Sequence, residues 1–151
     1  MQVNARVDYA IRAVVEVAAS GGELVRKRRL SEAQEIPERF LENILAQLVR
    51  TRILAASRGP QGGYTLERDA VDITIADIVR AVDGPLAAVR GIPPERLEYP
   101  QSSAVLRDVW VAVRSALRTV LERVTIDDLV RGELPEDVRE LVSQPGAWER
   151  R

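Results

Sequence analysis

The chain has 151 residues, of which 46% are hydrophobic and 30% charged, and its formal net charge is −1. This is the composition of a globular protein with one domain, or one domain and an accessory element. The chain contains no cysteine and no histidine, which excludes disulfides, thiolate nucleophiles, Cys- or His-based metal sites and Ser-His-Asp triads. We therefore expect no enzyme activity.

No apolar run approaches the roughly 20 residues of a membrane span, and the N-terminus lacks the pattern of a signal peptide. We therefore expect a cytoplasmic protein that does not contact membranes. Residues 1–70 carry eleven basic and nine acidic side chains, so a nucleic-acid-binding surface would have to be local.

The first two predicted helices carry apolar residues at helical spacing. The first covers residues 4–20, with Asn4 as its N-cap. The second lies near residues 28–35, where the apolar face is thin and Leu30 and Ala33 point inward. A short turn then leads to a third helix, and this order is typical of a helix-turn-helix.

The third predicted helix is strongly amphipathic. Pro37 fits its first turn, where a missing N–H costs nothing, and the helix runs to about Arg52. The stripe expected to be buried comprises Phe40, Leu41, Ile44, Leu45, Leu48 and Val49. The opposite face carries Arg39, Glu42, Asn43, Ala46 and Arg50.

Two short strands, 53–57 and 63–67, flank the turn Arg-Gly-Pro-Gln-Gly, which has the backbone freedom of a hairpin loop. The turn begins with Arg58. A helix followed by such a two-stranded wing can fill a DNA major groove and reach the adjacent backbone or minor groove.

A fourth helix is predicted over residues 74–83. Residues 84–103 contain four prolines and two glycines, which indicates a linker or an irregular loop. Ser102 or Ser103 is the predicted cap of a long helix that ends near Val124. Two short helices, 125–131 and 135–143, complete the chain, and Trp148 follows them.

The long helix carries a heptad seam about three heptads long. The residues assigned to a dimer interface are Leu106, Trp110, Val113, Leu117 and Val120. Because further apolar residues widen the seam, the helix must bury two sides, one on its own domain and one on a second copy. The predicted fold is mostly α with a small β-hairpin wing: a winged helix-turn-helix domain (1–83), a loop (84–103) and a segment with a dimerisation helix (104–151).

These motifs together resemble the Rrf2 family of bacterial winged helix-turn-helix regulators. The most specific piece is the wing, Arg-Gly-Pro-Gln-Gly-Gly-Tyr, and the helices before and after it follow in the family's order. The resemblance implies a homodimer that binds double-stranded DNA, with the third helix in the major groove. The residues it places at base edges are Arg39, Glu42 and Asn43.

The resemblance also assigns roles to the wing and to basic residues. The wing residues placed on DNA are Arg58, Gly59, Gln61 and Gly62, with Arg58 in the minor groove. Candidate phosphate contacts, which fix register rather than sequence, are Lys27, Arg28 and Arg50. The glycines, Gly63 included, would let the wing backbone approach phosphates closely.

The chain departs from many family members at one point. They hold an iron–sulfur cluster with three cysteines in the loop that corresponds to 84–103, whereas this chain has none, so it resembles the cluster-free branch and no cofactor is expected. Its signal would be a small molecule or a partner protein. Arg90, Arg96 and Tyr99 are either effector contacts or parts of a surface linker.

Two further alternatives remain open from the sequence. The basic run 26–29 is either a DNA contact or a solvated charge run. The whole chain is either a sequence-specific transcriptional regulator, more plausibly a repressor, or a winged helix used as a protein-interaction module.

Overall fold

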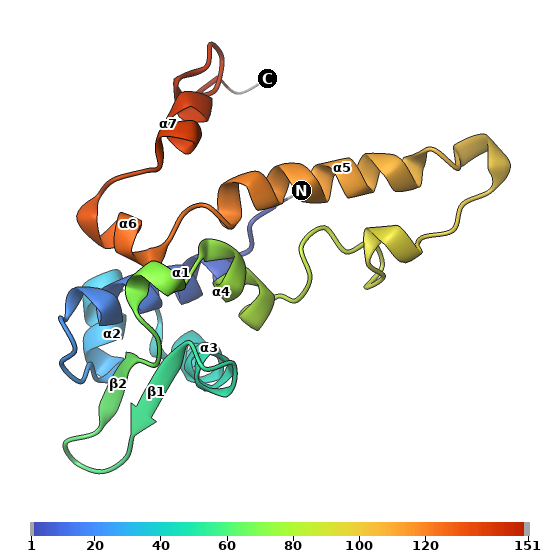
Figure 1. Cartoon of the computed structure of the whole chain (residues 1–151). Helices are drawn as coiled ribbons and strands as arrows, with labels where there is room; N and C mark the ends of the chain where they lie inside the picture. Colours follow the sequence, from blue (N-terminus) through green and yellow to red (C-terminus); the bar gives the residue numbers. More distant parts are fainter. Residues whose placement is uncertain (1, 150–151) are drawn as a thin grey trace.

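The computed structural model describes residues 2–149, and in this range it contains seven α-helices and one two-stranded sheet (Figure 1). The helices are α1 (Ala5–Ala19), α2 (Lys27–Gln34), α3 (Glu38–Arg50), α4 (Ile75–Val82), α5 (Leu106–Leu121), α6 (Ile126–Arg131) and α7 (Glu136–Ser143). The strands are β1 (Leu54–Ser57) and β2 (Gly63–Leu66). This order confirms the predicted fold class, a mostly helical chain with a β-hairpin wing.

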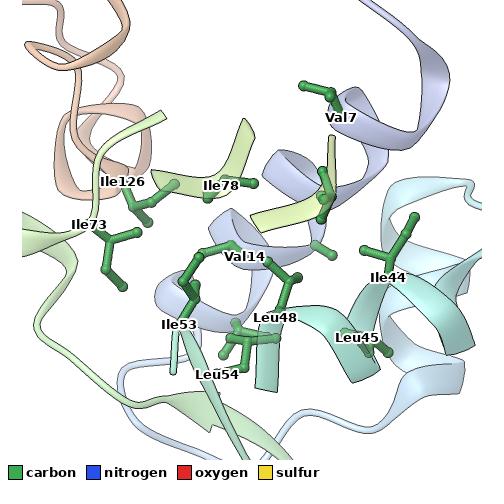
Figure 2. Close-up of a cluster of buried hydrophobic side chains, with 14 of the residues drawn as sticks. Val7, Val14, Ile44, Leu45, Leu48, Ile53, Leu54, Ile73, Ile78 and Ile126 are labelled. Atoms are coloured by element: carbon green, nitrogen blue, oxygen red, sulfur yellow. The ribbon is translucent and has the colours of Figure 1, made fainter. Parts of the chain in front are cut away.

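Helix α1 lies at the centre of the core and packs against α2, α3, α4 and α6. The Asn4 side chain caps it by accepting a hydrogen bond from the Val7 N–H at 3.0 Å, as predicted. Its buried face meets Leu48, Leu54 and Ile126 from three other elements (Figure 2). Burial of each of these large side chains contributes about 1.5–3 kcal/mol, so the core fixes how α3 and the hairpin sit on α1.

Helices α2 and α3 form the helix-turn-helix. Glu35 ends α2 in the left-handed region (φ 53°), and the buried side chains of Leu30 and Ile36 hold the turn against the core. The prediction that Ala33 points inward is wrong, because this side chain is exposed. Pro37 is the N-cap residue of α3 rather than part of its first turn.

The wing is an antiparallel hairpin in which Leu54 pairs with Leu66 and Ser57 with Gly63. Val25, in the segment between α1 and α2, pairs with Tyr64 through two backbone hydrogen bonds of 2.9 Å. The hairpin is therefore attached along β2 to the segment that enters α2.

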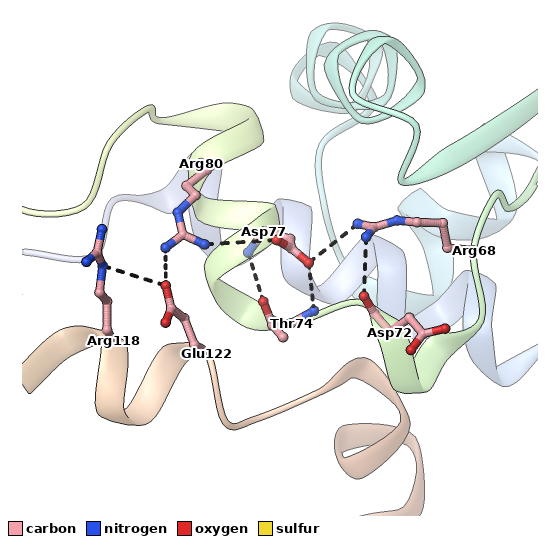
Figure 3. A network of polar contacts seen from close by, with 7 residues as sticks. All are labelled: Arg68, Asp72, Thr74, Asp77, Arg80, Arg118 and Glu122. Carbon is pink, nitrogen blue, oxygen red and sulfur yellow. Dashed lines mark hydrogen bonds and ion pairs between the residues drawn. The ribbon is translucent and has the colours of Figure 1, made fainter. Parts of the chain in front are cut away.

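Helix α4 connects the hairpin to the long helix through a polar network (Figure 3). Thr74 and Asp77 form a capping box at its start. Asp77 also forms an ion pair with Arg68, which follows β2, at 3.4 Å. Arg80 forms an ion pair with Glu122, the residue that follows α5. The network joins three elements that are distant in sequence.

The segment 84–103 is irregular, as predicted, with the 3₁₀ helices η2 (Pro94–Arg96) and η3 (Gln101–Ser103). It is packed rather than loose, since Leu86, Pro94 and Leu97 are buried and η2 contacts α5. Neither Ser102 nor Ser103 caps α5. Both belong to η3, and the helix begins after Val105 without a side-chain cap.

Helix α6 packs against α1, and α7 follows it in the chain. Thr125 and Asp128 form the capping box of α6, and hydrogen bonds from Thr125 lower the pKa of the Asp128 carboxyl. Ile126 and Val138 are buried in the same core as α1. Trp148 stays 85% exposed, with its Nε1 donating to the Val142 carbonyl at 3.0 Å.

None of the helices in residues 2–149 is both long and apolar enough to cross a membrane.

Candidate nucleic-acid interface

The three residues predicted to read bases lie together on the exposed face of α3. Arg39, Glu42 and Asn43 are all exposed and are spaced as residues of one helix face. The opposite face is buried through Leu41, Ile44, Leu45 and Leu48. The core thus holds α3 with a polar face directed to solvent, which a major groove could accept.

Phe40 does not belong to the buried stripe, contrary to the prediction, since 45% of it is exposed. It sits at the margin of the stripe, where its ring contacts Tyr9 with centroids 5.9 Å apart. The Arg39 guanidinium lies 4.9 Å from the centre of the Phe40 ring. This contact restrains Arg39 at the first turn of α3.

The tip of the wing is a tight turn between the strands. The Gly62 N–H donates to the Gly59 carbonyl at 2.9 Å, and Gly59 has φ 101°, which favours glycine. A Cβ on Gly62 would lie 2.3 Å from the Ser57 carbonyl oxygen, and one on Gly63 would lie 2.9 Å from that of Val25. The fold itself therefore requires both glycines.

Arg58 and Gln61 are exposed at this tip. In Figure 1 the hairpin lies beside α3, and β1 packs against that helix. The predicted base-reading face and the predicted wing contacts therefore come from neighbouring elements of one rigid core.

The predicted phosphate contacts differ in their surroundings. Lys27 lies 3.9 Å from Glu38, and Arg28 lies 2.8 Å from Glu32, whose hydrogen bond raises the pKa of Arg28. In contrast, Arg39, Arg50 and Arg58 form no ion pair with any carboxylate among residues 2–149. Their charges remain available to a polyanion.

Sequence reasoning missed Arg26, which it treated only as one of four basic residues. Its guanidinium donates to the Pro60 carbonyl at 2.9 Å and to Gln61 Oε1 at 3.3 Å. The contact joins residues 34 and 35 positions apart, and no local pattern in the sequence signals it.

The α5 residues predicted to form a dimer interface differ in their surroundings. Trp110 and Leu117 line a cavity of about 720 Å³ formed with α1, α4 and the start of the 84–103 segment. Leu106 is exposed at 36%, with Val105 and Val109 at 72% and 47% beside it. Val113 and Val120 are half-buried. No residue of α5 is fully buried, and Figure 1 shows this helix extending away from the core.

The structure does not gather Arg90, Arg96 and Tyr99 into one site. Arg90 and Arg96 are exposed, and Tyr99 Oη accepts a hydrogen bond from Trp110 Nε1 at 3.1 Å. None of the three lines the 720 Å³ cavity or a second cavity of about 370 Å³ beside Arg80 and Arg114.

Comparison with known proteins matches residues 3–132 to the family model Rrf2, described as an iron-dependent transcriptional regulator. The chain is 43% identical over 150 residues to Mycobacterium tuberculosis Rv1287, which bears the name of an HTH-type transcriptional regulator; the match covers 99% of this chain and 93% of that protein.

Solved structures also resemble this chain. CymR, the global cysteine regulator of B. subtilis, superimposes with a TM-score of 0.71 at 25% identity, covering 87% of this chain and 98% of that one. T. potens IscR superimposes with a TM-score of 0.69 at 27% identity, covering 87% and 88%.

The residues of this chain do not fit the iron site that the family description implies. There is no cysteine or histidine, and no group of three or more acidic residues within 2–149 could hold a metal ion. In the 84–103 segment, Glu95 pairs with Arg114, and hydrogen bonds from its own backbone and from Arg114 lower the pKa of its carboxyl.

Proposed function

Because the chain belongs to the Rrf2 family of transcriptional regulators, we propose that it is a sequence-specific DNA-binding repressor that acts as a homodimer without an iron–sulfur cluster. Members of this family regulate transcription and are not enzymes, in agreement with the expectation from the sequence. We further propose that it acts in the cytoplasm, where its DNA would lie.

The observation that carries the proposal is the exposed polar face of α3 beside the wing tip. Arg39 can donate to guanine O6 and N7, Glu42 can accept from cytosine N4, and Asn43 can bond adenine. Arg58 at the tip suits a narrow minor groove, where the negative potential is strongest. Helix α3 would supply the major-groove contacts and the wing the minor-groove contacts.

Phosphate contacts would complete the interface. Arg50 forms no ion pair among the described residues and is free to contact the DNA backbone. Lys27 and Arg28 would give up their ion pairs with Glu38 and Glu32 and bind phosphate oxygens instead. Such contacts add affinity that depends on salt but little sequence preference.

Dimerisation through α5 is supported by its unpartnered apolar surface. Val105, Leu106 and Val109 are exposed in the single chain, and small residues, Ala112 and Ala116, lie along the same side. A two-fold axis would place the same patch of both copies together and present two α3 helices to one operator. The operator would then be an imperfect palindrome with half-sites about one helical turn apart, or a multiple.

Repression follows from steric exclusion, since a dimer bound across a promoter keeps other proteins from the DNA that it covers. A small molecule or partner protein near residues 84–103 would shift the spacing of the two wings and thereby the affinity for DNA.

A mobility-shift titration on the promoter of the chain's own gene tests the proposal. We expect a shift that weakens steeply with salt, and Glu42→Ala should relax preference at one base pair without lowering affinity for all sequences equally. No shift at low salt would contradict DNA binding. A shift without salt dependence would favour the protein-interaction module, and a uniform loss from Glu42→Ala would contradict base reading.

A further inference from the structure

Within residues 2–149, the side chain of Arg26 holds the tip of the wing from outside the hairpin. Its Nη2 atom donates to the Pro60 carbonyl at 2.9 Å and to Gln61 Oε1 at 3.3 Å. Pro60 and Gln61 are the two central residues of the turn that the Gly62 N–H closes onto the Gly59 carbonyl. The guanidinium therefore contacts the wing at the turn, beyond the last pair of residues that the two strands share.

The backbone beside Arg26 supports the same hairpin along β2, close to the turn. Val25 exchanges two backbone hydrogen bonds of 2.9 Å with Tyr64, at a point where Gly63 leaves room for the Val25 carbonyl. Arg26 is the N-cap residue of α2 and makes no capping hydrogen bond with its side chain. Its guanidinium is thus free to reach along the hairpin, and α2 carries it at a fixed distance from α3.

We infer that Arg26 is a positioning residue, which fixes the wing tip relative to the helix-turn-helix and so places Arg58 and Gln61 for contact with DNA. This inference rests on the proposed function. Arg58 directly precedes Gly59, the first residue of the held turn, and no ion pair with a carboxylate of residues 2–149 restrains its own guanidinium. Its position depends on the turn that carries it.

The contact also determines what Gln61 can offer to a ligand. An amide side chain has one accepting oxygen and an NH₂ group that only donates. Because Oε1 already accepts from Arg26, Nε2, a donor, is the Gln61 group that has no hydrogen-bond partner among residues 2–149. In a minor groove the acceptors it can meet are adenine N3 and thymine O2, so the wing would favour an A·T pair at that position.

Salt dependence separates positioning from direct contact. Each phosphate that a protein charge neutralises adds about 0.9 to the slope of log affinity against log salt. If Arg26 acts through the turn, Arg26→Ala lowers affinity about tenfold, the loss expected for hydrogen bonds to a charged group, and leaves this slope unchanged. Both hydrogen bonds come from Nη2 at the end of the arginine side chain, so Arg26→Lys keeps the charge, but its shorter side chain does not bring the ammonium nitrogen to the two acceptors and its affinity stays low.

The test measures DNA affinity by fluorescence anisotropy over a salt series, for wild type, Arg26→Ala, Arg26→Lys, Arg58→Ala and the double variant Arg26→Ala/Arg58→Ala. The control is Arg139→Ala, which removes an equal charge from α7, where that guanidinium donates to the Leu134 carbonyl at 3.0 Å. We expect Arg26→Ala to cost much less affinity in the Arg58→Ala background than in wild type. Three results for affinity would each overturn the inference: no loss in Arg26→Ala, additive losses in the double variant, or full recovery in Arg26→Lys. A salt slope lowered by about 0.9 in Arg26→Ala would overturn it as well.

A measurement without DNA separates this inference from the proposed function. Hydrogen exchange of the Gly62 amide, which closes the turn, should be faster in Arg26→Ala than in wild type, while the thermal midpoint and the exchange of core amides stay unchanged. Equal Gly62 exchange in Arg26→Ala and wild type would overturn the positioning role of Arg26 even if the protein binds DNA. Faster Gly62 exchange in Arg26→Ala, together with a wild-type protein that binds no DNA, would instead refute the proposed function alone.

Discussion

Replacing Val109 by aspartate tests the proposed dimer surface on α5. Val109 is 47% exposed in the single chain. Complete burial of a valine side chain is worth at least about 1.5 kcal/mol, so burial of the exposed half is worth roughly 0.7 kcal/mol. A two-fold interface contains the residue twice, and the lost contact amounts to about 1.4 kcal/mol, or a tenfold weaker dimer.

The introduced charge adds to this loss. Moving a carboxylate out of water costs several kcal/mol unless it finds a partner. We therefore expect the dimer dissociation constant of Val109→Asp to rise by about 100-fold or more. Sedimentation velocity over a concentration series measures it, and circular dichroism checks that the exposed substitution leaves the helices intact.

Ser115→Asp is the matched control, since Ser115 is an exposed polar residue of the same helix outside the apolar stripe. It should dimerise like wild type. Dimers of unchanged strength in Val109→Asp, or equal dissociation of both variants, would refute the assignment of the interface to this side of α5.

Three further predictions concern the wing and α6. Arg58→Ala should weaken DNA binding about 10- to 100-fold in anisotropy titrations, and unchanged affinity would contradict its role. Gly63→Ala forces a Cβ to 2.9 Å from the Val25 carbonyl, so urea denaturation should show a loss of about 1–3 kcal/mol; a loss near zero would refute the close packing. Hydrogen bonds from Thr125 lower the folded-state pKa of Asp128, so its stabilisation is complete above the unfolded pKa and disappears as the pH falls through the folded one. Asp128→Asn should therefore flatten the decline of stability below about pH 4, and an unaltered acid profile would count against this.

Periodicity predicted α1, α3 and α4 well because each packs one face against the core. The stripe of Leu41, Ile44, Leu45 and Leu48 is buried as expected. Phe40 was misplaced because a residue at the margin of a stripe is buried or exposed according to its tertiary neighbours, here Tyr9. Ser103 failed as a cap because it belongs to a 3₁₀ turn after Pro100.

The candidate site was predictable only where it follows local patterns. The glycines of the wing marked the turn, but their packing against Ser57 and Val25 depends on chain segments brought together by folding. The contact from Arg26 to the turn has the same origin. Similarly, the heptad seam could not reveal which of its residues line the cavity with α1 and α4 and which stay exposed in the single chain.

The most direct test of sequence-specific binding by a pair of α3 helices and wings is selection of bound sites from a random DNA library by the wild-type protein. The account predicts enrichment of one imperfect palindrome, with half-site centres about 10 base pairs or a multiple apart. An unenriched library, or an enriched site without two-fold symmetry, would contradict it.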